Sequence, residues 1–475
     1  MISHFAPGLA TYYLICEWAI RIGMLFFVPF RRTPQAAQSW LLLIFFLPIP
    51  GALLYAAIGR PRFPAWRKQR FLALRPFFAD ISQALVDAGA VPDAPGPAEA
   101  LADTLGFLPA TAGNTVEFLD DYDATVDRLV ADIDSARHHV RILVYIFADD
   151  STGRKLIDAL VRAAARGVAC HVMIDAFGSH HWSRRVMALL TAAGVEARLV
   201  LPFRLLHRRT RNDMRNHRKL FIVDGVIGYA GSQNIVDRSF KPGIVNRELV
   251  ARLTGPVVTE MNAVFVGDWY LETERMIPSV ENGPVEICAP GPGSGTAQLL
   301  PSGADYPLEG FETFLVWQIH RAEHRVIVTT PYLVPDEDLL GAMRTAVARG
   351  VAVDLIVSTV ADQKLVSLAQ RSYFEGLLDA GIRIHRFRDF LLHAKNVSID
   401  GTLAVVGSSN VDLRSFQLND EVSLLLCDAE SVARLEAIQQ GYIEGSDLLT
   451  ADQWRARPKV QRVLESLARL VSPLL

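Results

Sequence analysis

One stretch of sequence occurs twice in this 475-residue chain, and no other feature constrains its fold as strongly. Residues 216–234 carry His, Lys and Asp in the order H-x-K-x4-D, followed by G-S-x-N. Residues 392–410 repeat the same residue types at the same spacing. Composition alone predicts only about 0.1 copies of a looser His-x-basic-x4-acidic pattern, so chance does not explain two strict copies. The repetition indicates a duplicated functional unit.

Each copy is typical of a strand, a tight turn and a second strand. The flanking runs are β-rich, and the Asp-Gly pair between them is a strong signal for a two-residue hairpin. We expect the His and the Lys, two residues apart, to point to the same face of the first strand. Lys supplies positive charge, His a nucleophile or proton carrier, and Ser and Asn neutral donors. The pattern therefore predicts an anion site, whereas one copy alone would also fit a basic exposed hairpin.

The duplication extends beyond the motifs. The joints between a helix and the following strand match, with AAARGVACHVMID at 163–175 and AVARGVAVDLIVS at 346–358. Downstream, IVDRSF at 235–240 matches VDLRSF at 411–416. A repeat of this length predicts an α/β fold with two homologous lobes, which divide near the Gly- and Pro-rich residues 284–295.

The two motifs resemble the signature of the phospholipase D superfamily, and within it the chain is similar to the bacterial cardiolipin synthases. PYLVPDE at 331–337 and the C-terminal SPLL also fit that family. The resemblance implies two phospholipase D-type lobes, each a mixed sheet flanked by helices, related by pseudo-two-fold symmetry. It also implies an enzyme that joins two phosphatidylglycerol molecules into cardiolipin and releases glycerol through a phosphohistidine intermediate.

The resemblance assigns roles to individual residues. His217 attacks phosphorus, and His393 protonates the leaving alcohol and then deprotonates the incoming one, although the two could be exchanged. No metal or cofactor is expected, because two lysines supply the positive charge. The candidate catalytic residues are His217, Lys219, Asp224, His393, Lys395 and Asp400; Glu248 and Glu421 are expected to orient the imidazoles; and Ser232, Asn234, Ser408 and Asn410 are expected to bind phosphate.

Some positions are expected to support the site. Asp224 and Asp400 open the Asp-Gly turns and are expected to hold the motifs in shape. Asn396 stands where the family usually has an apolar residue, and we expect it to pack on the face opposite Lys395. Asp336 is expected to cap a helix that follows it. The amphipathic stretch at 460–471 is expected to dock on the catalytic lobe.

Two apolar segments precede the lobes. Residues 9–30 can span a bilayer, at about 33 Å for 1.5 Å per residue. Glu17 and Arg21 interrupt this run at i and i+4, where they can form an ion pair. Residues 40–58 have about the minimum spanning length, and two prolines predict a kink. We expect a transmembrane helical hairpin and no cleaved signal peptide, with an interfacial helix as the alternative.

The distribution of basic residues predicts the orientation of this hairpin. Two arginines lie between the apolar segments, and six Lys or Arg residues follow the second one, between residues 60 and 75. The excess predicts cytoplasmic lobes. The resemblance to the bacterial cardiolipin synthases implies a multi-pass protein of the bacterial inner membrane. We expect the basic strip to lie against anionic headgroups. The predicted domains are a membrane hairpin at 1–60, a juxtamembrane segment and linker at 61–105, and lobes at 106–285 and 286–475.

Composition restricts the remaining alternatives. The net charge of −3 provides no basic field of the kind that attracts nucleic acid, so no nucleic-acid partner is expected. The four scattered cysteines predict free thiols and no zinc site. A phospholipase D hydrolase, a phosphatidylserine synthase, a nuclease and a non-catalytic scaffold for anionic lipid are the rival hypotheses. A homo-oligomer, and phosphatidylethanolamine as the second donor, are left open.

Overall fold

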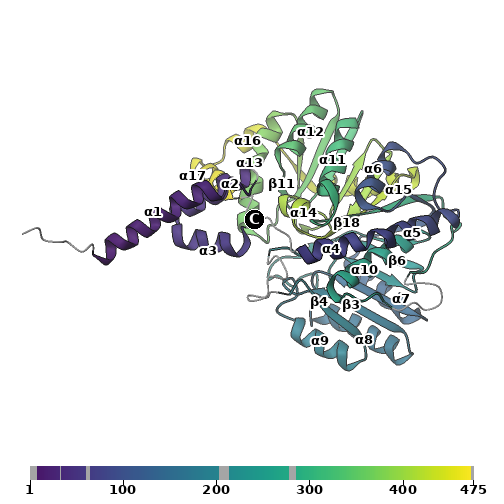
Figure 1. Cartoon of the computed structure of the whole chain (residues 1–475). Coiled ribbons are helices and arrows are strands. Elements are labelled where there is room, and N and C mark those ends of the chain that lie inside the picture. Colours follow the sequence, from purple (N-terminus) through teal and green to yellow (C-terminus); the bar gives the residue numbers. More distant parts are fainter. Residues whose placement is uncertain (1–7, 33, 60–64, 203–212, 278–284, 472–475) are drawn as a thin grey trace, which may run out of the picture.

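The computed structural model describes residues 8–32, 34–59, 65–202, 213–277 and 285–471 (Figure 1). The elements of the N-terminal part are α1 (Leu9–Phe27), α2 (Pro34–Phe46), α3 (Pro48–Ile58), α4 (Ala65–Ala73), α5 (Arg75–Asp87) and α6 (Pro97–Gly106). The elements of the first half are β1 (Thr111–Leu119), α7 (Tyr122–Ser135), β2 (His139–Val144), α8 (Ser151–Ala165), β3 (Ala169–Asp175), α9 (Ser183–Ala192), β4 (Glu196–Val200), β5 (Leu220–Val223), β6 (Ile227–Gly231), β7 (Asn246–Arg247), β8 (Val250–Thr254) and α10 (Val257–Thr273).

The second half follows with the same alternation of helices and strands. Its elements are β9 (Gly295–Ser302), the 3-10 helix η1 (Pro307–Glu309), α11 (Gly310–Arg321), β10 (Arg325–Thr329), β11 (Leu333–Val334), α12 (Glu337–Ala348), β12 (Ala352–Ser358), α13 (Lys364–Asp379), β13 (Arg383–Phe387), β14 (Leu391–Leu392), β15 (Asn396–Ile399), β16 (Leu403–Gly407), β17 (Val411–Asp412), α14 (Leu413–Gln417), β18 (Glu421–Leu426), α15 (Ala429–Glu444), β19 (Ser446–Leu449), α16 (Ala451–Arg455) and α17 (Lys459–Val471).

One 15-stranded sheet runs through both halves. Its order is β19-β13-β12-β10-β15-β16-β18-β9-β1-β8-β6-β5-β2-β3-β4. In each half three parallel strands are followed by antiparallel ones, and β1 pairs with β9 where the halves meet. The mixed α/β fold that the duplication predicts is therefore present, but the two sheets are joined at their edges into one.

Local sequence signals explain several boundaries. The strands of the matching helix–strand joints at 163–175 and 346–358 are β3 and β12. The side chain of Asp336 accepts a hydrogen bond from the backbone N–H of Leu339 at 2.9 Å, so it caps α12 as expected. Helix α7 ends at Ser135, shortly before β2 begins at His139. The Pro-rich stretch at 91–99 contains the start of α6.

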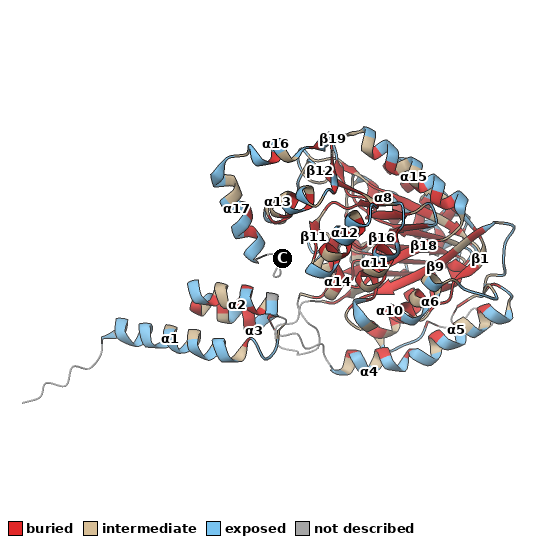
Figure 2. Ribbon diagram, turned by 90° about the horizontal axis from the view of Figure 1, so that it is seen from above, coloured by how far each residue is buried: buried red, intermediate tan, exposed pale blue. Residues whose placement is uncertain are grey.

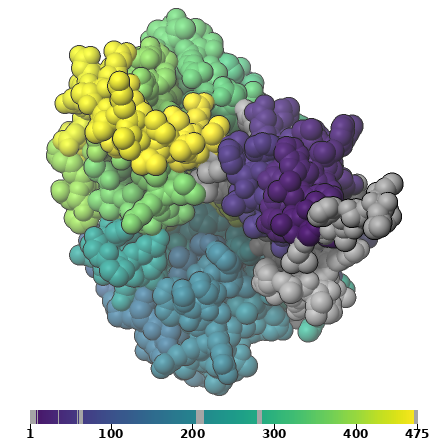
Figure 3. Space-filling model, turned by 90° about the vertical axis from the view of Figure 1, so that its left-hand side faces the viewer, coloured from purple at the N-terminus to yellow at the C-terminus, as the bar shows by residue number. Residues whose placement is uncertain are grey.

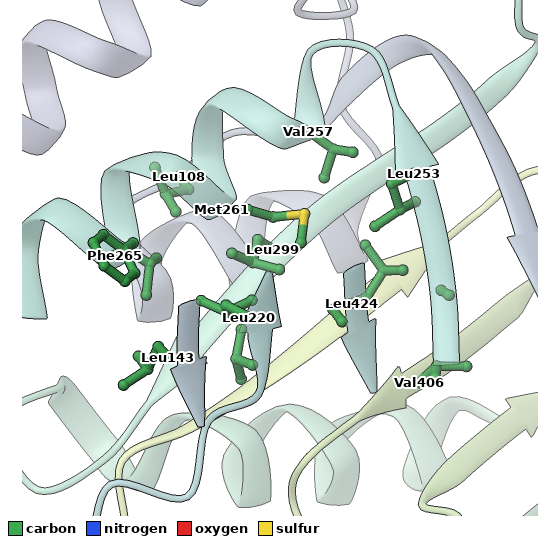
Figure 4. Close-up of a cluster of buried hydrophobic side chains, with 14 of the residues drawn as sticks. Leu108, Leu143, Leu220, Leu253, Val257, Met261, Phe265, Leu299, Val406 and Leu424 are labelled. Carbon is green, nitrogen blue, oxygen red and sulfur yellow. The ribbon is translucent and has the colours of Figure 1, made fainter. Parts of the chain in front are cut away.

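The main hydrophobic core crosses the boundary between the halves. Helix α10 lies over the sheet and contributes Val257, Met261 and Phe265 (Figure 4). Leu220 of the first half and Leu424 of the second half belong to the same buried cluster. Because the two halves share this core, their strands are held in a fixed relation to one another.

Helices α1, α2 and α3 project from one side of the two lobes (Figure 1), and α1 is largely exposed (Figure 2). Residues Ala10–Phe27 form the one described helix that is long and apolar enough to cross a membrane, with a mean hydropathy of 1.2. Glu17 and Arg21 form the expected ion pair at 3.3 Å. The second apolar segment is two short helices, α2 and α3, because the helix breaks at Leu47 before Pro48.

Candidate active site

Each motif histidine lies just before a hairpin and not within its first strand. His217 and Lys219 occupy the connection between a β-bridge at Asn216 and the start of β5. His393 and Lys395 occupy the connection between β14 and β15. The expectation that the His and Lys share a strand is therefore wrong in detail. The hairpin strands start only after the lysine, where the chain begins to pair with its neighbours.

The histidines are oriented by glutamates from the opposite half of the chain. His217 Nδ1 lies 3.0 Å from both carboxylate oxygens of Glu421. His393 Nδ1 lies 2.8 and 3.0 Å from those of Glu248. In each pair Nδ1 is engaged by the carboxylate, which leaves Nε2 as the ring nitrogen for reaction.

Backbone hydrogen bonds support the same crossed arrangement. The N–H of His217 donates to the carbonyl of Asp420, and the N–H of His393 donates to that of Arg247, both at 2.8 Å. Each acceptor immediately precedes the glutamate that contacts the same histidine. The main chain therefore fixes each histidine and its glutamate in register across the boundary between the halves.

The two lysines are buried and, like the motif serines, do not line the pocket described below. Lys219 Nζ donates to the carbonyl of His217 at 2.6 Å, and Lys395 Nζ donates to that of His393 at 2.5 Å. Burial lowers the pKa of Lys219 to about 7 and that of Lys395 to about 8, although the glutamates oppose the change. Burial likewise lowers the pKa of His217 to about 4, with Glu421 opposing, so this imidazole is neutral at pH 7.

The aspartates of the two motifs hold the turns. Asp224 accepts hydrogen bonds from the N–H groups of residues 137, 138 and 139 at 2.7–2.9 Å. Asp400 accepts the same three bonds from residues 323, 324 and 325 at 2.7–2.8 Å. Both aspartates have positive φ, at 51° and 53°, as the first position of a type I′ turn requires. They lie outside the pocket lining described below.

The Gly-Ser pairs explain how the hairpins pack on the glutamate strands. A Cβ at Gly231 would lie 2.4 Å from the carbonyl oxygen of Leu249, just before β8, and a Cβ at Gly407 would lie 2.4 Å from that of Val422 in β18. The following serines bind the same neighbours: Ser232 accepts the N–H of Leu249, and Ser408 accepts that of Val422, both at 3.0 Å. Ser408 also donates to Glu421 at 2.5 Å. The serines thus contact the glutamate segments and do not line the pocket.

One pocket of about 640 Å³ joins the two motifs. Both histidines line it, together with Asn234 and Asn410. Its lining contains side chains from both halves of the chain. The two motif histidines therefore line one common pocket.

Several residues that line the pocket lie outside the two motifs. The ring of Tyr145 lies 4.9 Å from that of His217, and the ring of Tyr332 lies 6.3 Å from that of His393. The Tyr332 hydroxyl donates to Asp362 at 2.7 Å, and Lys241 Nζ contacts the same carboxylate at 2.5 Å. Tyr332 belongs to the PYLVPDE stretch that the sequence singled out. Lys241 and Asp362 carry no comparable signal, because they converge only in three dimensions.

A buried network of ion pairs includes Asp420, whose carbonyl accepts a hydrogen bond from His217, and it contradicts one prediction. Arg67 of α4 belongs to the basic strip that was expected to face lipid headgroups, but its side chain is buried. It contacts Asp305 at 2.7 Å, Asp420 at 2.9 Å and Glu272 at 3.2 Å. Burial opposes its charge, but these carboxylates outweigh burial and raise the pKa of Arg67. Arg60 and Arg62 of the same strip lie outside the described residues.

Arg218 extends this network to the glutamate. Arg218 Nη1 contacts Asp268 at 2.5 Å, and Arg218 Nε donates to the carbonyl of Glu421 at 2.9 Å. The corresponding position in the second motif is Ala394. Asn396, the departure from the family pattern, is buried and accepts a hydrogen bond from Gln439 at 2.9 Å. The first motif is therefore supported by an ion pair of Arg218, and the second by an amide hydrogen bond of Asn396.

Comparisons with known proteins agree with this architecture. A family model described as "Cardiolipin synthase, PLD-like domain" matches residues 129–269 and 315–441. Cardiolipin synthase A from Serratia proteamaculans (strain 568) is 36% identical, over 98% of this chain and 100% of its own length. Cardiolipin synthase A from Pectobacterium carotovorum subsp. carotovorum (strain PC1) is 34% identical over the same shares.

Among solved structures, phosphatidylserine synthase from Haemophilus influenzae Rd KW20 has a similar fold. It covers 80% of this chain and 99% of its own, with a TM-score of 0.62 and 16% sequence identity. The resemblance to the phospholipase D superfamily that the motifs indicated is confirmed by the family match and by the full-length relatives. The chain belongs to the cardiolipin synthase family and carries two PLD-like domains.

Proposed function

We propose that the protein is a cardiolipin synthase, a phosphatidyltransferase that joins two phosphatidylglycerol molecules and releases glycerol. This proposal rests on two His–Glu contacts, each of which joins a histidine of one half to a glutamate of the other. Both of these histidines line the same pocket. Two imidazoles with fixed Nδ1 atoms supply a nucleophile and a proton carrier for the same phosphorus.

In the first step, Nε2 of His217 attacks the phosphorus of one phosphatidylglycerol. The P–N bond forms as the P–O bond to glycerol breaks, and His393 donates a proton to the departing glycerol oxygen. The product is a phosphatidyl-histidine, with His393 left neutral. Glu248 stabilises the proton-bearing form of His393, since its carboxylate lies against Nδ1.

In the second step, the primary hydroxyl of another phosphatidylglycerol attacks the same phosphorus. His393 takes the hydroxyl proton, the new P–O bond forms, and the P–N bond to His217 breaks. Asn234 and Asn410, which line the pocket, bind the non-bridging oxygens, and the buried Lys219 and Lys395 supply positive charge during both steps. The motifs and the glutamates are kept in place by Asp224, Asp400, Ser232 and Ser408.

The mirrored strand order around the β1–β9 junction supports a pseudo-two-fold relation between lobes at 106–285 and 286–475.

The apolar N-terminus supports a membrane location for this chemistry, with the lobes on the cytoplasmic side of the bacterial inner membrane. Helix α1 has the length and hydropathy of a single span. A second pass to complete the hairpin would have to use the shorter α2 and α3 with their break at Leu47. A membrane-attached site meets its lipid substrates without extracting them into water.

The test follows labelled phosphatidylglycerol with purified protein in vesicles. The expected products are cardiolipin and glycerol in equal amounts. His217→Ala and His393→Ala should each remove turnover, whereas His320→Ala, an exposed histidine at the end of α11, should not. Phosphatidic acid as the sole lipid product would instead identify a hydrolase, and a requirement for phosphatidylethanolamine would identify a different second donor.

A further inference from the structure

The C-terminal helix α17 carries its apolar side chains on the surface of the protein. Val460, Val463, Leu464, Leu467 and Leu470 recur at helical spacing and form one stripe. Each of these side chains is between 49% and 72% exposed. An exposed apolar stripe of this regularity is typical of a surface that binds a partner.

Ion pairs on the other side of α17 fix this orientation. Glu465 is 1% exposed and contacts Arg457 at 2.9 Å and Arg371 of α13 at 3.3 Å. Ala468 is also buried against the lobe. The helix docks on the lobe as the sequence predicts, but through its polar side. The apolar stripe therefore faces away from the lobe, and a partner that covers it would be stabilised by the burial of apolar surface.

The stripe lies next to the other exposed apolar surface of the protein. Helix α17 contacts α2, and the C-terminal residues (yellow) lie beside the N-terminal helices (purple) in Figure 3. Phe45 and Phe46 of α2 and Trp18 of α1 are at least half exposed. Lys459 is exposed at the start of the same helix, whereas Arg462 donates to the carbonyl of Arg455 and Arg469 contacts Glu337 at 3.7 Å. Apolar side chains flanked by basic ones are the pattern of helices that lie in a membrane interface.

We propose that α17 lies in the headgroup region of a lipid bilayer, with its apolar stripe in the acyl chains and Lys459 against anionic headgroups. This inference rests on the proposed membrane location. It has a consequence for substrate entry, because α17 is attached to α13 through Glu465. Gln363, which precedes α13, and Val366 within it line the pocket. The bilayer contact of α17 therefore holds one wall of the pocket at the membrane surface.

The test measures contact with lipid and does not depend on turnover. In a Cys16→Ala background, Leu467→Cys is labelled with an environment-sensitive fluorophore in full-length protein reconstituted in phosphatidylglycerol–phosphatidylcholine vesicles. Gln440→Cys, on the exposed side of α15, is the matched control. Lipids brominated on their acyl chains should quench the label at 467 at least three-fold more than the label at 440.

Two results would overturn the placement. Equal quenching at both positions would mean that α17 faces water. A label at 467 that is shielded from aqueous iodide but insensitive to brominated lipid would mean that protein, such as a second copy of the chain, covers the stripe. If the label is quenched by brominated lipid but no cardiolipin is formed, the proposed reaction fails while the placement of α17 stands.

Discussion

His217 and Glu421 are 204 positions apart in the chain, yet His217 Nδ1 lies 3.0 Å from both carboxylate oxygens of Glu421. Glu248 and His393 form the reciprocal contact. Each half thus supplies the carboxylate that orients the histidine of the other half. Neither half contains a complete His–Glu pair of its own, so the site exists only when both halves are folded together.

Removal of either carboxylate should impair turnover without unfolding the protein. Glu421→Gln keeps the shape of the side chain but no longer favours the Nδ1–H tautomer or the charged imidazole. We expect kcat to fall by about 10²–10⁴-fold, the range for general acid–base assistance. Glu248→Gln should have an effect of similar size. Steady-state cardiolipin formation is the measurement, with Glu430→Gln at the exposed start of α15 as the control. A loss of less than three-fold in both variants would rule out the orienting role.

The buried lysines predict a limit on the alkaline side of the pH profile. Burial lowers the pKa of Lys219 to about 7 and of Lys395 to about 8, so both are charged below pH 7 and lose their protons as the pH rises. The free enzyme should therefore bind the lipid phosphate less well above pH 7. We expect kcat/KM to fall between pH 7 and pH 9, measured at constant ionic strength. A flat profile to pH 9 would mean that the lysines stay charged or do not bind phosphate.

Arg67 predicts a large effect on stability from a residue far from both motifs in sequence. Arg67→Gln would leave Asp305, Asp420 and Glu272 without their shared cation, and breaking a buried ion pair costs about 3–5 kcal/mol. Lys68→Gln removes the same charge from the exposed side of α4 and should change stability by less than about 0.5 kcal/mol. Chemical unfolding in detergent measures both. Equal stability of the two variants would contradict the ion network.

The glycine of the second motif predicts a steric effect. Gly407→Ala would place a Cβ 2.4 Å from the carbonyl oxygen of Val422, so β16 and β18 must move apart. Overpacking of this kind costs about 1–3 kcal/mol, and the shift should also displace Glu421 from His217 and lower kcat. Gly441→Ala in α15 is the control, because its Cβ meets nothing within 4 Å. That variant should be as stable as the original protein or more so. A Gly407→Ala protein with normal stability would show that the strands tolerate the methyl group.

The duplication allowed much of the fold to be predicted from the sequence. Strands such as β3 and β12 follow from short apolar runs with clear ends, and the Asp-Gly turns follow from residues that tolerate positive φ. The merged sheet could not be predicted, since the pairing of β1 with β9 depends on two strands that lack the motif signal. The break at Leu47 was indicated only as a proline kink.

The sequence identified the two histidines that line the pocket, but not the contacts that hold them. The family resemblance pointed to Glu248 and Glu421, but sequence separation does not reveal which glutamate meets which histidine. The prediction that Arg67 faces lipid headgroups is wrong. A basic residue after an apolar segment usually lies at the headgroups, but here Arg67 contacts carboxylates from three distant segments. The outward stripe of α17 was missed because helical periodicity does not say which face packs inward.

The central claim is that two imidazoles act on one lipid phosphorus. Rapid acid-free quenching of the enzyme with phosphatidylglycerol labelled in its phosphate, followed by mapping of labelled peptides, tests it most directly. The account predicts a base-stable phosphoramidate on His217, absent in His217→Ala. It predicts that His393→Ala slows both the formation and the discharge of this adduct. Cardiolipin formation with no label on either histidine during turnover would contradict the account.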